Sequence, residues 1–254
     1  MRTYSTKNYW DTVASELLQR TEDDDSTIAS DDTPYYALKQ TRFFEEFLDM
    51  ATRDARSVLE IGSGPGGNLA RISSHGKLAF GVDVSPSMLK LARRRGPYGL
   101  VQIDGSRLPF QDGSCDAVFT STVLQHNTPE LATGLLLEMA RVSAREIHLF
   151  EDTAPLHFRD RRSHWLRPPS WYASRLEPLG YELTFQKRLP LTCQEIAATV
   201  ARLITDRGQR QGAPATMRRL RIEDGLSRLA RPVDRVIPPM MGLTRMSFYR
   251  TSVT

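Results

Sequence analysis

The stretch "SVLEIGSGPGGN", residues 57–68, decides the fold of this chain, because an apolar run containing the carboxylate Glu60 meets four glycines and a proline. The run is typical of a short buried strand, and "GGNLARISSH", which follows it, is typical of a helix. Glycine lets the connection adopt positive φ angles and approach a ligand closely, since no Cβ intervenes. We therefore expect a ligand to lie on this loop, at the end of the strand.

The same alternation continues along the chain. Further strands are expected in "LAFGVDV", "LVQID", "CDAVFTST" and "EIHLFED", with helices in "SPSMLKLARRRG" and "TPELATGLLLEMARVS" between them. Ser85 before Pro86 and Thr128 before Pro129 mark two helix starts, as an N-cap followed by a first-turn proline. Strictly alternating strands and helices predict a parallel sheet that is covered on both faces.

Both ends of the chain add to this α/β pattern. Helical spacing is present in "YWDTVASELLQR" and "PYYALKQTRFFEEFLDM" near the N-terminus, and in "PSWYASRLEPLG" after residue 150. "YELTFQKRL" and "GLTRMSFYRT" are expected to be the last two strands, separated by about fifty residues with helical patterns. A connection of that length predicts an inserted cap or an oligomer surface.

The composition is that of one soluble globular domain. The chain has 254 residues, of which 40% are hydrophobic, and a net charge of +4. With no run of about eighteen apolar residues and no secretory signal, we expect no membrane span and a cytoplasmic protein. Cys115 and Cys193 have neither metal-ligand spacing nor a disulfide framework around them. Arginines gather late in the sequence, a pattern that fits solvated helix faces and permits an acidic or nucleic-acid partner.

The glycine loop alone leaves two ligands open. Gly62, Gly64 and Gly67 fit G-x-G-x-x-G, and Asp83 ends the next strand, as in an NAD-dependent oxidoreductase on a Rossmann fold. Glu60, however, would lie unfavourably beside a pyrophosphate and favourably beside a cation. Asp104 ends the third strand. Three acids at successive strand ends suit a ligand with an amine, a ribose diol and an adenine.

The motifs "EIGSGPGG", "GVDVSPSML" and "LPFQDGSCD" together resemble those of class I S-adenosylmethionine-dependent methyltransferases of the small-molecule branch, with Cys115 where that family usually has an aromatic residue. The resemblance implies a Rossmann-like seven-stranded sheet, mostly parallel with an antiparallel last strand, with N-terminal helices and a helical insertion before that strand. We expect one domain over residues 1–254. Its parts are an N-terminal helical cap (1–52), a cofactor-binding core (53–153), an acceptor-side segment (154–190), a helical insertion or lid (191–241) and the final strand (242–254).

The resemblance also implies roles for individual residues around S-adenosylmethionine. The loop after the first strand would line the methionine portion, Asp83 would bind the ribose hydroxyls, Asp104 would accept from the adenine amine, and the end of the fourth strand would receive the ammonium group. The expected cofactor-binding residues are Tyr36, Glu60, Gly62, Ser63, Gly64, Asp83, Val84, Met88, Asp104, Gly105, Ser106, Leu108, Thr120 and Ser121. For Val84 and Leu108, core packing explains the sequence equally well, and ordinary helix packing does so for Tyr36.

Methyl transfer from a sulfonium is an in-line displacement that depends on positioning, and a general base helps when the acceptor is a hydroxyl. His126, Glu151 and Asp152 are the candidate catalytic residues, with His157 and His164 further along. A structural hydrogen bond or a turn cap would explain each of these residues as well.

Acceptor and partners are narrowed by what the sequence lacks. No Asn/Asp-Pro-Pro-aromatic turn follows the fourth strand, so a nucleic-acid acceptor is not favoured. We expect no metal and a small-molecule acceptor. The acceptor segment offers an aromatic or anionic acceptor the side chains of Arg159, Trp165, Arg167 and Trp171. Solvated arginines beside core tryptophans explain that segment equally well. A homodimer is compatible with the insertion, and a non-catalytic nucleic-acid-binding protein on the same fold is a third alternative. The sequence leaves oxygen, nitrogen and carbon methylation open.

Overall fold

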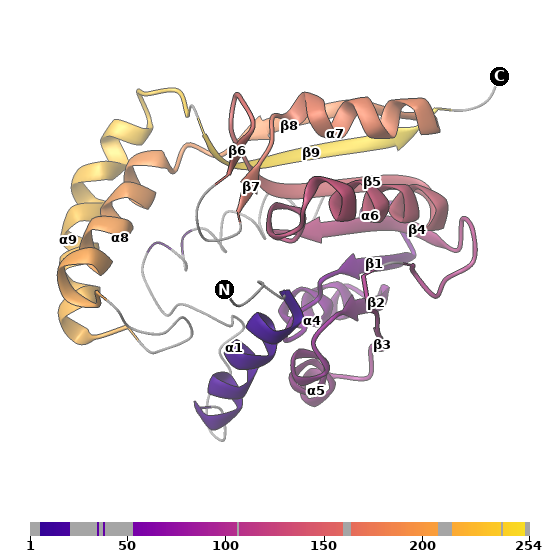
Figure 1. Ribbon diagram of the computed structural model, residues 1–254, viewed down its shortest axis with the longest axis horizontal. Coiled ribbons are helices and arrows are strands. Elements are labelled where there is room, and N and C mark those ends of the chain that lie inside the picture. Colours follow the sequence, from indigo (N-terminus) through magenta and orange to yellow (C-terminus); the bar gives the residue numbers. More distant parts are fainter. Residues whose placement is uncertain are drawn as a thin grey trace.

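The computed structural model describes residues 6–20, 35, 38, 53–105, 107–159, 164–207, 215–239 and 241–251. Within them lies a seven-stranded sheet with helices on both faces, in the order β3-β2-β1-β4-β5-β9-β8 (Figure 1). The strands are β1 (Ser57–Ile61), β2 (Leu78–Asp83), β3 (Gly99–Gln102), β4 (Cys115–Ser121), β5 (Ser143–Thr153), β8 (Tyr181–Arg188) and β9 (Gly242–Arg250).

The first five of these strands pair in parallel, and β9 runs antiparallel to both of its neighbours, β5 and β8. This confirms the predicted mostly parallel, seven-stranded sheet with an antiparallel last strand. Its helices are α1 (Thr6–Arg20), α4 (Gly67–Ser74), α5 (Pro86–Arg95), α6 (Pro129–Val142), α7 (Pro169–Leu176), α8 (Thr192–Thr205) and α9 (Met217–Asp234).

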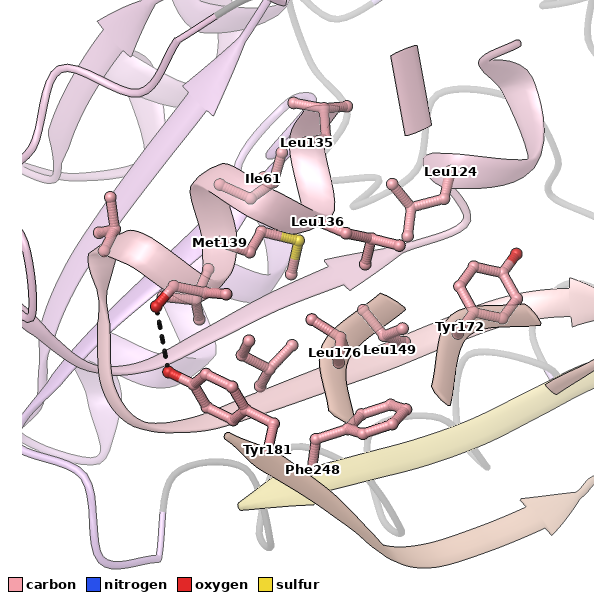
Figure 2. Close-up of a cluster of buried hydrophobic side chains, with 14 of the residues drawn as sticks. Ile61, Leu124, Leu135, Leu136, Met139, Leu149, Tyr172, Leu176, Tyr181 and Phe248 are labelled. Carbon is pink, nitrogen blue, oxygen red and sulfur yellow. Dashed lines mark hydrogen bonds between the residues drawn. The ribbon is translucent and has the colours of Figure 1, made fainter. Parts of the chain in front are cut away.

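Alternating side chains on β1 explain why both faces of the sheet are covered. Leu59 and Ile61 join a core beneath α6 and α7, whereas Val58 joins a second core with residues of α4. Figure 2 shows the first core, in which Tyr181 lies beside Phe248 and donates from its hydroxyl to the Ala140 carbonyl oxygen at 3.3 Å. Strands buried on both faces are expected when crossover helices cover a parallel sheet.

The predicted helix starts at Ser85 and Thr128 are confirmed. Ser85 Oγ accepts from the Met88 amide at 3.1 Å, and Thr128 Oγ1 accepts from the Leu131 amide at 3.4 Å. A small two-stranded ribbon, β6 (Phe158–Arg159) with β7 (Trp165–Leu166), was not expected from the sequence.

The insertion between β8 and β9 contains the helices α8 and α9, as the sequence predicted. The amide of Leu189 donates to the Leu243 carbonyl oxygen at 2.8 Å, so the insertion leaves and rejoins the sheet at neighbouring points. Figure 1 shows these two helices side by side, beyond the carboxyl ends of the parallel strands. None of the helices in the described ranges is long and apolar enough to cross a membrane.

The N-terminal helix α1 packs on α5 near the same edge of the sheet. Val13, Ala14 and Leu17 form a small core with Met88 and Leu91. The predicted second N-terminal helix lies outside the described residues, except for Tyr35 and Leu38, which are both helical.

Candidate active site

The glycine loop after β1 is held against the end of β2 by its own backbone. The amides of Gly62 and Ser63 both donate to the Val82 carbonyl oxygen, at 2.8 and 3.0 Å. Gly62, Gly64 and Gly66 have φ angles of 72°, 50° and 81°, in the left-handed region that favours glycine. The loop thus brings bare backbone to the carboxyl edge of the sheet.

Two of these glycines face different surroundings. A Cβ on Gly62 would lie 2.5 Å from Val123 Cγ2, whereas a Cβ on Gly64 would meet nothing within 4 Å. Gly62 therefore lets the loop pack against the segment after β4. Gly64 leaves open space at the backbone, which a ligand could use.

Glu60 is buried beside this loop without full hydrogen bonding. The residue is 1% exposed, and Asn68 Nδ2 donates to its Oε1 atom. Its Oε2 atom and the nearby Ser63 Oγ are buried without a hydrogen-bond partner. Burial, and next the negative charge of Asp83, raise the pKa of Glu60 well above its ordinary value. An unsatisfied buried carboxylate oxygen is costly and is suited to a cationic or hydrogen-donating ligand.

Asp83 lies at the end of β2 and is 7% exposed. Its Oδ2 atom accepts from the Gly64 amide at 2.9 Å, and its Oδ1 atom accepts from the Ser85 amide at 2.8 Å. Burial raises its pKa, the two amides act in the opposite direction, and the charge of Asp11 on α1 adds to the rise. Each carboxylate oxygen keeps acceptor capacity for a hydroxyl.

The structure places the residues expected around the adenine in different environments. Asp104 is exposed, Val84 is half-buried, and Gly105 has a φ of 93° with nothing within 4 Å of the Cβ position. Leu108 is 1% exposed and belongs to the core beneath α6, while its amide donates to Glu138 Oε2 at 2.8 Å. Tyr36 and Ser106 lie outside the described residues.

Met88 is likewise a packing position. It is 2% exposed and contacts the α1 core, so it supports the helix that follows Asp83.

The segment after β4 is anchored by the buried Glu151. Thr120 Oγ1 and the Val123 amide donate to its Oε1 atom at 2.8 and 3.1 Å, and the Gln125 amide donates to Oε2 at 3.2 Å. Burial raises the pKa of Glu151 to about 7, against the effect of these donors. With both oxygens bound to the loop, the contacts favour a positioning role for Glu151.

Thr122 in the same segment has a φ of 58°, the only non-glycine residue with a positive φ among those described. A β-branched residue in this region is strained, and such outliers cluster at functional sites. Ser121, just before it, is half-buried at the end of β4.

His126 lies at the outer end of the segment, between side chains from two other parts of the chain. Its ring centre is 4.5 Å from that of His164 and 5.6 Å from that of Trp10, which meets it edge-on. His126 is half-buried. His157 is exposed outside this cluster.

Asp152 and Arg167 are both engaged in holding this region together. Gln125 Nε2 donates to Asp152 Oδ2 at 3.1 Å, and the Asp152 amide donates back to Gln125 Oε1 at 2.6 Å. Arg167 is 1% exposed and donates to the carbonyl oxygens of Leu124 and Asn127 at 2.8 and 2.5 Å. Arg167 therefore stabilises the segment after β4. Its contacts do not support a role in binding an anionic acceptor.

The structure thus brings the predicted residues together in two groups. Glu60, Ser63, Gly64 and Asp83 form the first group, at the ends of β1 and β2. Thr120, Ser121, His126, Glu151 and Asp152 form the second, at the ends of β4 and β5, and the contact between Gly62 and Val123 joins the groups.

Four further residues of the site were missed from sequence: Trp10, Asp11, Asn68 and Gln125. Asn68 carries a readable signal, since it is the second residue of the helix that follows the loop. The other three are identified only by the packing of distant segments.

Comparison with known families identifies the central part of the chain. Residues 59–149 match the family described as "Methyltransferase domain". A demethylmenaquinone methyltransferase of Beutenbergia cavernae is 36% identical over 95 residues, and one of Corynebacterium kroppenstedtii is 39% identical over 90 residues. These matches cover 37% and 35% of this chain, and only 39% and 38% of the two relatives, which is well under half of each.

Solved structures show the same fold over nearly the whole chain. The [4+2]-cyclase SpnF superposes with a TM-score of 0.68 at 15% identity, covering 96% of this chain and 95% of the other. The magnesium protoporphyrin IX methyltransferase of Synechocystis PCC 6803, with bound S-adenosylmethionine, gives a TM-score of 0.61 at 12% identity, with coverage of 96% and 95%. At such low identity these structures support the fold alone.

The sheet order, the glycine loop with its acids and the matched family agree with one another. Residues 59–149 of this chain thus match a methyltransferase domain, within a fold that is also found in a methyltransferase with bound S-adenosylmethionine.

Proposed function

We propose that this chain transfers a methyl group from S-adenosylmethionine to a small-molecule acceptor. The observation that carries the proposal is the unpartnered Oε2 atom of Glu60, buried beside Asp83 and next to the open backbone of Gly64. We infer that the missing partner is a hydrogen donor, and two neighbouring buried carboxylates favour a ligand that carries positive charge.

The same charges argue against a dinucleotide. A pyrophosphate on this loop would place further negative charge beside Glu60 and Asp83, at a distance where like charges repel. A nucleoside that carries an ammonium and a sulfonium group has the opposite effect. Glu60 and Ser63 would hold its amino-acid portion, Asp83 its ribose hydroxyls, and the Asp104–Gly105 turn the adenine side.

The bound cofactor would supply an activated methyl group that needs no covalent enzyme intermediate. This leaves positioning and water exclusion to the protein. The segment after β4, held by Glu151 and Arg167, would fix the geometry at the reacting end. Of the candidate bases, His126 is best placed to take a proton from a hydroxyl or amine acceptor, because Glu151 and Asp152 are bound to the segment itself.

A small organic acceptor is supported by the kinds of protein that this chain is similar to. The names of its relatives and structural neighbours include demethylmenaquinone, magnesium protoporphyrin IX and geranyl diphosphate methyltransferases. We infer an acceptor of this size class, bound between the carboxyl edge of the sheet and the helices α1, α8 and α9. A cytoplasmic location, a homodimer and the expected domain boundaries remain predictions.

Calorimetric titration with S-adenosylhomocysteine and with NAD tests the proposal. We expect the first to bind and the second not to bind. Glu60→Gln should weaken binding about tenfold or more, since it removes one charge at a buried site. Glu182→Gln, on the exposed side of β8, is the matched control and should bind as the native chain does. NAD binding without S-adenosylhomocysteine binding would refute the assignment.

A further inference from the structure

The helical hairpin of α8 and α9 is closed by a buried carboxylate at its base. Asp234, at the end of α9, accepts from the amides of Cys193 and Gln194 at 2.7 and 3.1 Å, and from Gln194 Nε2 at 3.2 Å. The start of α8 is therefore fixed to the end of α9, and the two helices run antiparallel. Figure 1 shows the pair standing clear of the sheet.

The inner side of this hairpin is small and polar, the reverse of an ordinary surface helix. The buried residues of α8 are Gln194 and three alanines, Ala197, Ala198 and Ala201. Those of α9 include Glu223 and Ser227. A surface helix normally turns its aliphatic side chains inward and its charges outward.

The aliphatic side chains of α8 instead point to solvent. Ile196, Val200, Leu203 and Ile204 are 58%, 38%, 51% and 59% exposed, and they recur at the spacing of one helical face. On α9, Leu229 and Val233, one turn apart, are 73% and 40% exposed.

These two stripes lie on the same side of the hairpin. Ala201 marks the direction in which α8 is buried, and Ala230 marks that direction for α9. At 100° per residue, and with each helix viewed from its own N-terminus, both apolar stripes lie counterclockwise of these directions. In an antiparallel pair the same rotational flank of each helix faces the same way. The six side chains therefore form one apolar surface, which we call the outer face. Monomeric proteins rarely expose contiguous apolar surface without a binding function.

Charge is divided across the hairpin in a matching way. The acids Asp206, Glu223 and Asp234 are buried, and so is Arg219, which lies 3.5 Å from Glu223 and 3.9 Å from Asp206. The exposed charges of α9 and its end are mainly arginines: Arg218, Arg221, Arg228, Arg231 and Arg235. Arg228 pairs with Asp224 at 2.8 Å. At 100° per residue, Arg218 lies on the same flank of α9 as Leu229, and Arg221 lies next to that flank, so this border of the outer face is positive. Arg231 and Arg235 lie on the opposite flank.

We propose that the outer face binds the surface of a lipid bilayer that contains anionic lipids. Exposed aliphatic stripes bordered by arginines are the pattern of helices that lie in the membrane interface, where the apolar side chains enter the acyl boundary and the arginines meet acidic headgroups. The two helices would lie flat on the bilayer, and the carboxyl edge of the sheet would stand just above it.

A second copy of the chain fits the outer face less well. Self-association through a two-fold axis would bring the same arginine-rich borders together, with like charges opposed. An anionic surface neutralises them instead. The proposal does not depend on the reaction that the site performs.

Flotation with lipid vesicles, in the absence of any cofactor, tests whether the outer face binds a membrane. The full chain should float with vesicles of phosphatidylcholine and phosphatidylglycerol and bind much less to phosphatidylcholine alone. The double variant Ile196→Ser, Leu203→Ser should lose about tenfold or more of this binding. The matched control is Leu131→Ser, Leu137→Ser on α6, whose side chains are 50% and 47% exposed. It should float as the native chain does.

The electrostatic part has its own pair of variants. Arg218→Gln, Arg221→Gln should weaken binding to the anionic vesicles, whereas Arg93→Gln, Arg94→Gln on α5 should not. Unchanged binding in the α8 variant would overturn the proposal. So would a native dimer that the same variant dissociates while no vesicle binds. Titration with S-adenosylhomocysteine checks the fold of every variant, and a chain that floats but fails this titration would refute the proposed reaction alone.

Discussion

At Gly62, the backbone conformation and the surrounding side chains impose the same restriction. Its φ of 72° disfavours any side chain, and an added Cβ would overlap Val123. At Gly64 the φ is 50°, but the Cβ position is open.

Gly64→Ala should therefore cost about 1 kcal/mol of unfolding free energy, for the backbone alone. Gly62→Ala should cost about 3 kcal/mol or more, because the overlap adds to the backbone strain. Urea unfolding measures both. Adding Val123→Ala should recover part of the Gly62→Ala loss and none of the Gly64→Ala loss. Equal losses in the two single variants would contradict this account.

The strain at Thr122 predicts an unusual response to glycine. Thr122→Gly should leave the free energy of unfolding unchanged or raise it by up to about 1 kcal/mol, because glycine adopts this φ freely. Ser121→Gly, in the extended backbone of β4, should lower it by about 1 kcal/mol. If both variants lose stability to the same extent, the strain at Thr122 is not real.

Glu151 predicts a specific dependence of stability on pH. Burial raises its pKa from 4.5 to about 7, so the folded state binds its proton more tightly than the unfolded state does. Its contribution is complete below about pH 4.5 and declines as the pH rises through 7, by about 3 kcal/mol in all. Glu151→Gln should remove this decline. Urea unfolding of both proteins at about pH 5 and pH 8 measures the difference. Parallel pH profiles would refute the shift.

Sequence could predict which residues gather at the site, but not how they are engaged. Glu60 and Asp83 were assigned from their places at strand ends, which local pattern determines. The engagement of Glu151 with Thr120 and Gln125 depends on the register of β4 against β5. The edge-on contact of Trp10 with His126 depends on the packing of α1, which no local pattern encodes.

Among the elements, α5 is bound to the site at its first residue. Ser85 caps the helix through Met88, donates from its amide to Asp83, and donates from its hydroxyl to Asp11 Oδ1 of α1 at 2.5 Å. One residue thereby links a helix start, the acid at the end of β2 and the N-terminal helix.

Ser85→Ala should cost about 2 kcal/mol of unfolding free energy, as it loses both the cap and the contact with α1. Thr128→Ala loses a cap alone and should cost about 1 kcal/mol or less. Chemical denaturation compares the two. A larger loss for Thr128→Ala would show that the α1 contact contributes nothing.

Element types were predictable because strong local signals repeat in this sequence. Proline after a capping residue placed two helix starts, and β-branched runs placed the strands. The ribbon of β6 and β7 was not predictable, since two-residue strands carry no periodicity. Just after the ribbon, the backbone of Arg167 bridges to Thr153 of β5, a contact between segments that no local pattern predicts.

At the scale of the whole molecule, strand order directs both groups of described site residues to one edge of the sheet. The opposite edge has a hollow of about 530 Å³ that includes Asp112, Arg141 and Arg250. Its arginines already donate to protein acceptors, Arg141 to Glu138 and Arg250 to the carbonyl oxygens of Ala140 and Ser143.

Hydrogen exchange should separate the two edges. S-adenosylhomocysteine should slow amide exchange about tenfold or more at residues 62–66 and 83–85, because a ligand that binds only the folded state suppresses local opening. Exchange at residues 112–114 should stay the same. Protection confined to residues 112–114 would place the ligand in the hollow instead.

The neighbouring exit and return points of the insertion, marked by the bond between Leu189 and Leu243, bear on how such enzymes diversify. A module that joins its host through two adjacent ends can be exchanged without rethreading the sheet. Replacement of this hairpin during evolution would change the surface beside the site, while the glycine loop and the acids at the ends of β1 and β2 stay the same.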